Sequence, residues 1–147
     1  MTVGSGAGDP GAGDPSGKDA SGGSPSVIRL SIPAELRFLR IARLTAAGIA
    51  GDLGFGLQDV EDLRVAVDEM CAALIEDADA GVDFELAYRI SEGRIEIEGR
   101  CSQGGPPPAL HPVARELLTM TADEFAIEGD DEGRRFLLIK RRSDLTV

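Results

Sequence analysis

The stretch LRVAVDEMCAALI, residues 63–75, carries the strongest secondary-structure signal in this chain. At about 100° per residue, its apolar side chains share one stripe with a valine just before it. The stripe consists of Val60, Leu63, Val67, Met70, Cys71, Leu74 and Ile75. Asp59 is the predicted N-cap, and the acidic residues that follow it suit the positive end of the helix dipole. The pattern therefore predicts a helix over residues 59–78 that buries one face.

Apolar and polar residues alternate in several segments around this helix, which is the period of strands with one buried face. The alternation predicts five strands, over residues 27–32, 84–90, 94–98, 124–128 and 135–141. Glu92-Gly93 is the predicted turn of the first hairpin, and the acidic segment 129–133 is that of the second.

Two further helices complete the predicted elements. One covers residues 34–50, after Pro33, because proline suits the first turn of a helix. A short one covers residues 112–120, after a loop over residues 101–110. The order β-α-α-β-β-α-β-β predicts an α/β two-layer sandwich of the α+β class. We expect a mixed, largely antiparallel sheet with helices on one face.

Composition bounds the domain organisation. The chain has 147 residues, of which 42% are hydrophobic, enough for one core. The block Gly-Ala-Gly-Asp-Pro at residues 6–10 repeats at 11–15, and Gly, Pro and Ser dominate residues 1–26. Such a segment has little to bury and cannot offset its ordering entropy. We predict a disordered tail over residues 1–26 and one domain over residues 27–147.

Charge and residue counts exclude several function classes. The formal net charge is −11, which repels nucleic-acid phosphates and anionic membranes. We find neither an apolar run of membrane-spanning length nor a secretory leader, so we expect no membrane contact. Two cysteines and one histidine are too few for a Cys/His zinc site, and no metal is expected. The cysteine usage suggests a reducing cytoplasm.

The stretch 63–75 and the element order resemble the anti-sigma factor serine kinases of the GHKL (Bergerat-type) ATPase superfamily, in their actinobacterial branch. Residues 63–75 match the N-box helix of that family, and the similarity covers about residues 27–141. The resemblance implies a histidine-kinase-like ATPase fold and a homodimer. It also implies a sigma factor and a STAS-domain anti-anti-sigma factor as partners, and ATP with Mg²⁺ as cofactors.

The resemblance also locates a nucleotide site whose motifs are eroded here. It implies that Glu69 is the general base, but Ala73 stands where the family has a magnesium-binding Asn four residues later. Alanine has no side-chain oxygen for a hard cation. The segment 97–101 has no Asp at the family's adenine-reading motif. Gly104 and Gly105 match the start of the phosphate-binding lid, but the three prolines that follow remove N–H donors.

The first helix carries a second face that mixes aliphatic and arginine side chains, formed by Leu36, Arg40, Arg43, Leu44 and Ala47. Arginine among apolar neighbours is common at protein–protein hot spots. The resemblance implies that Arg43 contacts the sigma factor and its antagonist, with Arg40 as a second candidate. We therefore predict a partner-binding surface that includes Arg40, Arg43 and Leu44. An ordinary solvated face is the alternative.

The functional hypothesis is an anti-sigma regulatory factor that sequesters a sigma factor and is countered by a STAS-domain antagonist. The alternative is an active ATP-dependent serine kinase that phosphorylates this antagonist, with Glu69 as base. A dimerisation module without a sigma partner is a third possibility. Glu69 is otherwise a solvated carboxylate, Cys71 a buried thiol, and Cys101 and His111 residues without catalytic neighbours. The basic residues 134–142 are interpreted as charge that guards a sheet edge.

Overall fold

The computed structural model describes residues 26–143, so nearly all of the predicted tail lies outside the described residues. The strands are β1 (Ser26–Pro33), β2 (Asp83–Ser91), β3 (Arg94–Cys101), β4 (Glu124–Asp130) and β5 (Gly133–Arg141). The helices are the 3-10 helix η2 (Leu36–Phe38) and the α-helices α2 (Leu39–Asp52), α3 (Leu57–Ile75) and α4 (Pro112–Thr121). The predicted element order is confirmed.

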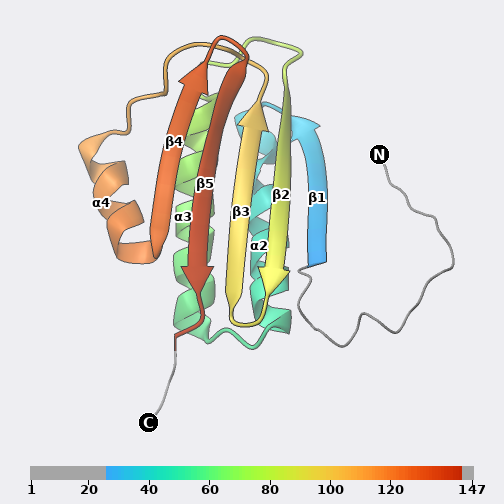
Figure 1. Ribbon diagram of the computed structural model, residues 1–147, viewed down its shortest axis with the longest axis vertical. Coiled ribbons are helices and arrows are strands. Elements are labelled where there is room, and N and C mark those ends of the chain that lie inside the picture. Colours follow the sequence, from blue (N-terminus) through green and yellow to red (C-terminus); the bar gives the residue numbers. More distant parts are fainter. Residues whose placement is uncertain (1–25, 144–147) are drawn as a thin grey trace, which may run out of the picture.

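The strands form one sheet in the order β1-β2-β3-β5-β4, and α2 and α3 lie side by side behind it (Figure 1). The predicted two-layer α+β fold is confirmed. The sheet is not mixed, because all four described strand pairs are antiparallel. The antiparallel β1–β2 pair arises because α2 and α3 each cross the sheet and return the chain to the end where β1 finishes.

Helix α3 has the predicted buried stripe but different ends. Its fully buried side chains include Leu63, Val67, Met70, Cys71 and Leu74. The helix begins two residues early, and its N-cap is Gly56 rather than Asp59, so the predicted cap is wrong. It ends at Ile75 instead of residue 78. The predicted first helix begins as η2 and continues as α2, with Leu39, Ala42, Ala46, Ile49 and Ala50 buried.

Asp59 is used for a tertiary contact instead of a cap. Its carboxylate accepts hydrogen bonds from the backbone N–H and the hydroxyl of Ser143, both at 2.8 Å. Lys140 of β5 places its ammonium 3.8 Å from Asp59 and 3.5 Å from Asp62. Asp59 and Lys140 are both buried. This cluster joins the first turn of α3 to the end of β5.

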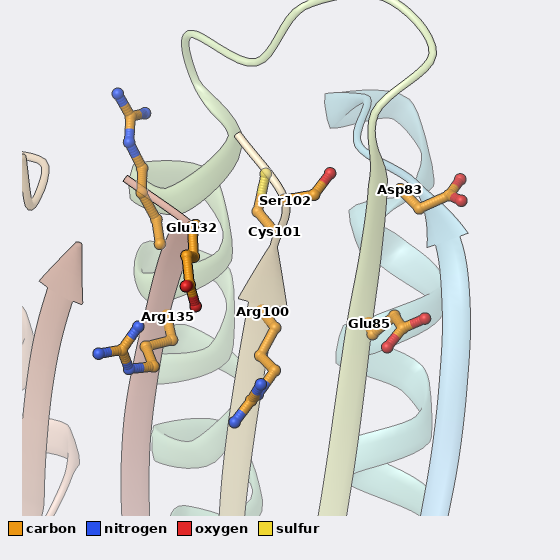
Figure 2. Close-up of a pocket in the computed structure, with 9 residues that line it drawn as sticks. Asp83, Glu85, Arg100, Cys101, Ser102, Glu132 and Arg135 are labelled. Atoms are coloured by element: carbon orange, nitrogen blue, oxygen red, sulfur yellow. The ribbon is translucent and has the colours of Figure 1, made fainter. Parts of the chain in front are cut away.

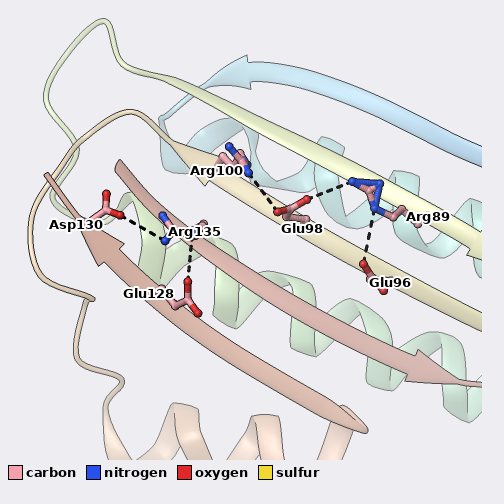
Figure 3. Close-up of polar contacts among 7 residues, drawn as sticks. All are labelled: Arg89, Glu96, Glu98, Arg100, Glu128, Asp130 and Arg135. Atoms are coloured by element: carbon pink, nitrogen blue, oxygen red, sulfur yellow. Dashed lines mark hydrogen bonds and ion pairs between the residues drawn. The ribbon is translucent and has the colours of Figure 1, made fainter. Parts of the chain in front are cut away.

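The helix-free face of the sheet carries cross-strand ion pairs (Figure 3). Arg89 of β2 contacts Glu96 and Glu98 of β3 at 3.7 and 3.4 Å, and Arg135 of β5 contacts Glu128 of β4 at 3.0 Å. Alternation along each strand puts these charges on one face and the apolar residues on the other. The predicted edge role of the basic residues is wrong for β5, because that strand lies between β3 and β4.

Candidate functional site

Glu69 and Ala73 lie one turn apart on α3, and both are half-buried. Positions four apart share a helix face, so the structure places them together as the family motif requires. Glu69 has no side-chain hydrogen bond or ion pair within residues 26–143. Ala73 contributes a methyl group and no oxygen. The pair therefore offers one carboxylate and no second ligand for a hard cation.

The end of β3, where the family carries its adenine-reading motif, is covered by a core side chain. Ile97, Gly99 and Cys101 face the helices and are buried. The ring of Phe136 lies so close to Gly99 that an added Cβ would sit 2.7 Å from its Cζ atom and 2.9 Å from its Cδ2 atom. Phe136 packs in turn against Phe84, with ring centroids 6.4 Å apart. Gly99 therefore provides room for an aromatic ring of the protein itself.

The loop that contains Gly104 and Gly105 is packed against the β4–β5 turn. The backbone N–H of Gly105 donates to the carbonyl of Asp130 at 2.9 Å. A Cβ on Gly129 would lie 2.5 Å from the carbonyl oxygen of Gly105, and one on Gly104 would overlap the carbonyl of Asp131. These glycines therefore permit a close backbone approach. One of the N–H groups predicted to face phosphate is already bonded within the chain.

The turn that receives this loop is held by Asp130. Its carboxylate accepts the backbone N–H of Glu132 at 2.9 Å and contacts Arg135 at 3.4 Å. The N–H bond first, and then the Arg135 guanidinium, hold the pKa of the Asp130 carboxyl below its ordinary value of 3.8. Because the pKa is lowered in the folded state, ionised Asp130 stabilises the turn at pH values above the ordinary pKa of an aspartate. This stabilisation is lost as the pH falls through the folded-state pKa.

A groove of about 380 Å³ opens beside the same turn, at one end of the sheet (Figure 2). Its charged lining is mixed in sign and consists of Asp83, Glu85, Arg100, Glu132, Arg134 and Arg135. None of the four predicted cofactor positions lines it. This groove is therefore distinct from the nucleotide site that the resemblance located.

The predicted partner-binding residues lie together on α2, but they are not equivalent. Arg40 is exposed and makes no hydrogen bond or ion pair within the described part of the chain. Leu44, one turn further on, is 57% exposed, and Leu36, one turn before Arg40, is 60% exposed. We call these three residues the α2 stripe, although Leu36 belongs to η2, which leads directly into α2. Arg43 instead donates from Nη1 to Oδ1 of Asp68 on α3, at 2.7 Å.

The two cysteines considered as candidate site residues are buried in the core. Cys71 is fully buried, and burial raises the pKa of its thiol, which makes it unreactive. Cys101 is buried at the end of β3, and both cysteines are free. Within residues 26–143, no three His, Cys, Asp or Glu side chains are placed to hold a metal ion. No helix in the same range is long and apolar enough to cross a membrane.

Known proteins are similar in sequence to about half of this chain. No protein-family model matches the chain. A protein described as serine-protein kinase RsbW, from Halalkalibacterium halodurans, is 38% identical over 74 residues, which are 50% of this chain and 46% of that protein. The protein of the same description from Bacillus thuringiensis is 36% identical over 73 residues, 48% of this chain and 45% of that protein. The chain spans about half the length of the curated relatives it matches.

A solved structure supports the fold. The structure of the RsbU and RsbW domains of Rv1364c from Mycobacterium tuberculosis matches with a TM-score of 0.63 and 15% sequence identity, and the match covers 81% of this chain and 33% of that one. The match shows that this chain and that structure share a two-layer fold. Over about half of its length, the chain is similar in sequence to proteins described as serine-protein kinase RsbW.

Proposed function

We propose that this protein is an anti-sigma regulatory factor. It binds and sequesters a sigma factor in the cytoplasm, and a STAS-domain anti-anti-sigma factor counters it. The observation that carries this proposal is the α2 stripe, an exposed row of Leu36, Arg40 and Leu44. Similarity to proteins described as serine-protein kinase RsbW supports placement in the anti-sigma serine kinase family, which supplies the class of partner. A homodimer is part of the proposal, and sedimentation velocity of the purified chain tests it.

The chemistry of the stripe supports a protein partner with acidic and apolar side chains. Two leucines more than half exposed lie one turn on either side of Arg40, which has no ion pair among residues 26–143, and they form a small apolar patch with a cation at its centre. Arginine binds carboxylates through its planar fork while its stem packs against apolar groups. On a chain with a net charge of −11, a cationic patch also gives an acidic partner a defined place to dock.

We further propose that partner binding needs no nucleotide. The residues present do not fit ATP with Mg²⁺, because Ala73 offers no oxygen and the Phe136 ring covers Gly99. The loop glycines are engaged with the β4–β5 turn. These three features support a regulatory binder over the alternative, an active kinase that uses Glu69 as base.

The binding proposal is tested by purifying partners from an extract of the source organism and titrating the recovered sigma factor. We expect Arg40→Glu to weaken binding by about 2 kcal/mol, or roughly thirtyfold in Kd, because it reverses the charge at the centre of the stripe. Leu44→Ala should weaken binding as well. Arg100→Glu and Leu57→Ala, exposed residues away from the stripe, are the matched controls.

Each outcome of that titration is decisive. Controls within about threefold of the parent, together with weak binding by the stripe variants, support the proposal. If the controls and the stripe variants bind equally, the stripe is not the interface. If extracts yield neither a sigma factor nor a STAS-domain protein, the anti-sigma function is wrong and a dimerisation module is favoured.

Nucleotide independence is tested by calorimetric titration of ATP with Mg²⁺ into the purified protein, with Glu69→Ala as companion. We expect no saturable heat and no thermal stabilisation up to millimolar ATP, because Ala73 offers no magnesium ligand and the Phe136 ring covers Gly99. Saturable binding in the micromolar range that is altered by Glu69→Ala would contradict this expectation. Phosphate transfer from ATP to a STAS-domain protein would then be measured, and its detection would establish the kinase alternative.

A further inference from the structure

The ion pair between Arg43 and Asp68 joins the partner-binding helix to the helix that carries Glu69. It spans the seam where α2 packs along α3, with 2.7 Å between Nη1 and Oδ1. The Arg43 side chain is 31% exposed and that of Asp68 is 43% exposed. Both groups are therefore shielded in part from water and can still be reached from outside.

We propose that Asp68 is a positioning residue that occupies Arg43 until a partner carboxylate takes its place. The inference rests on the proposed function and adds the chemistry of the partner: it must present an acidic side chain beside the groups that dock on the α2 stripe. Asp68 thereby tunes the affinity of the surface, because a partner gains the contact with Arg43 only by displacing Asp68 from it.

Guanidinium geometry is the physical reason for this exchange. Arginine has five N–H donors in a planar fork and binds a carboxylate best through two parallel hydrogen bonds. Asp68 takes one hydrogen bond from Arg43 with one oxygen, and no other side chain among residues 26–143 takes a second. A carboxylate from outside can therefore form a stronger contact than the internal one. It must do so beside the negative charge of Asp68, which opposes it.

The two arginines then act at different stages of binding. Arg40 has no partner within the described part of the chain and meets an incoming surface without breaking an ion pair there. Arg43 contacts the partner only after its ion pair with Asp68 has broken. Partners without an acidic group at this point gain nothing from Arg43, so Asp68 favours partners that carry one.

The test measures the Kd of the sigma factor, recovered as described above, for four variants of the full chain. We expect Asp68→Asn to tighten binding by about fivefold, the weight of one half-buried ion pair. Arg43→Gln should weaken binding, and Asp68→Asn should bring no gain when Arg43→Gln is already present. Glu61→Gln removes one negative charge from the same helix about two turns from Asp68, where the carboxylate contacts Arg64 instead of Arg43, and it should change Kd by less than about twofold.

A merely structural role for Asp68 predicts the opposite sign, because a disturbed helix seam weakens binding. Asp68→Glu restores the competing carboxylate and should return the Kd toward that of the parent chain. The Nε–H signal of Arg43 in nuclear magnetic resonance spectra should shift when the sigma factor is added. If Asp68→Asn leaves Kd unchanged or raises it, this inference is wrong while the anti-sigma function stands. If the parent chain binds no sigma factor, both fall together.

Discussion

Replacing Asp59 by alanine should destabilise the protein by about 3 to 5 kcal/mol, because it leaves the buried ammonium of Lys140 with an incomplete set of partners. Lys140 is 8% exposed, and Asp59 is 6% exposed. The substitution also removes the acceptor for two hydrogen bonds from Ser143, each 2.8 Å long. These contacts link α3 to the end of β5, so the loss should lower the stability of the whole domain. Urea unfolding monitored by circular dichroism measures it.

A matched substitution separates the buried pair from general charge removal. Asp62→Ala removes the other, more exposed carboxylate near Lys140 and should cost about 1 kcal/mol, since Asp59 remains. Lys140→Met in the Asp59→Ala background should recover part of the loss, because it removes the charge left without Asp59. Equal losses for Asp59→Ala and Asp62→Ala would show that burial of the pair is not what matters.

Gly99→Ala should cost about 3 kcal/mol of stability, because the added methyl group meets the ring of Phe136. That ring is 2% exposed and packs against Phe84, so it has little room to move. Gly48→Ala is the control, since Gly48 lies within α2 and an added Cβ there meets nothing within 4 Å. The control should be neutral or stabilising by up to about 1 kcal/mol, because alanine is the better helix former.

A double-mutant cycle identifies the contact responsible. Phe136→Leu should reduce the cost of Gly99→Ala, because the smaller side chain makes room for the methyl group. Thermal unfolding of the four proteins gives the coupling energy. If the two effects simply add, Phe136 does not fill the space above Gly99, and the ring does not close this region to a nucleotide base.

Local pattern was enough to predict most elements and part of the site. The period of the apolar residues predicted α3 and the strands, because burial on one face requires apolar side chains at that period. Residues four positions apart share a helix face, so the spacing of Glu69 and Ala73 was enough to place them together. The N-terminus of α3 was less well predicted, since Gly56 is the N-cap and the carboxylate of Asp59 accepts hydrogen bonds from Ser143 instead.

The arrangement of the residues that we propose as a partner surface was predicted only in part. Helical geometry placed Arg40 and Leu44 on an exposed face, as observed. It could not show that Arg43 reaches across to α3, because Asp68 lies 25 positions further along the chain. The same limit applied to β5, whose basic residues resembled an edge strand until the strand order placed β4 beyond them.

The residue sequence was therefore sufficient to predict the elements, the buried stripe of α3 and the lack of a side-chain oxygen at residue 73. Each of these depends on residue types and on neighbours within a few positions. Three contacts depend on the three-dimensional fold: Phe136 covers Gly99, the loop glycines pack on the β4–β5 turn, and Asp68 holds Arg43. Such contacts arise when the sheet order and helix packing bring distant segments together. Local periodicity shows which face of an element is buried, but it does not show which other segment packs against that face.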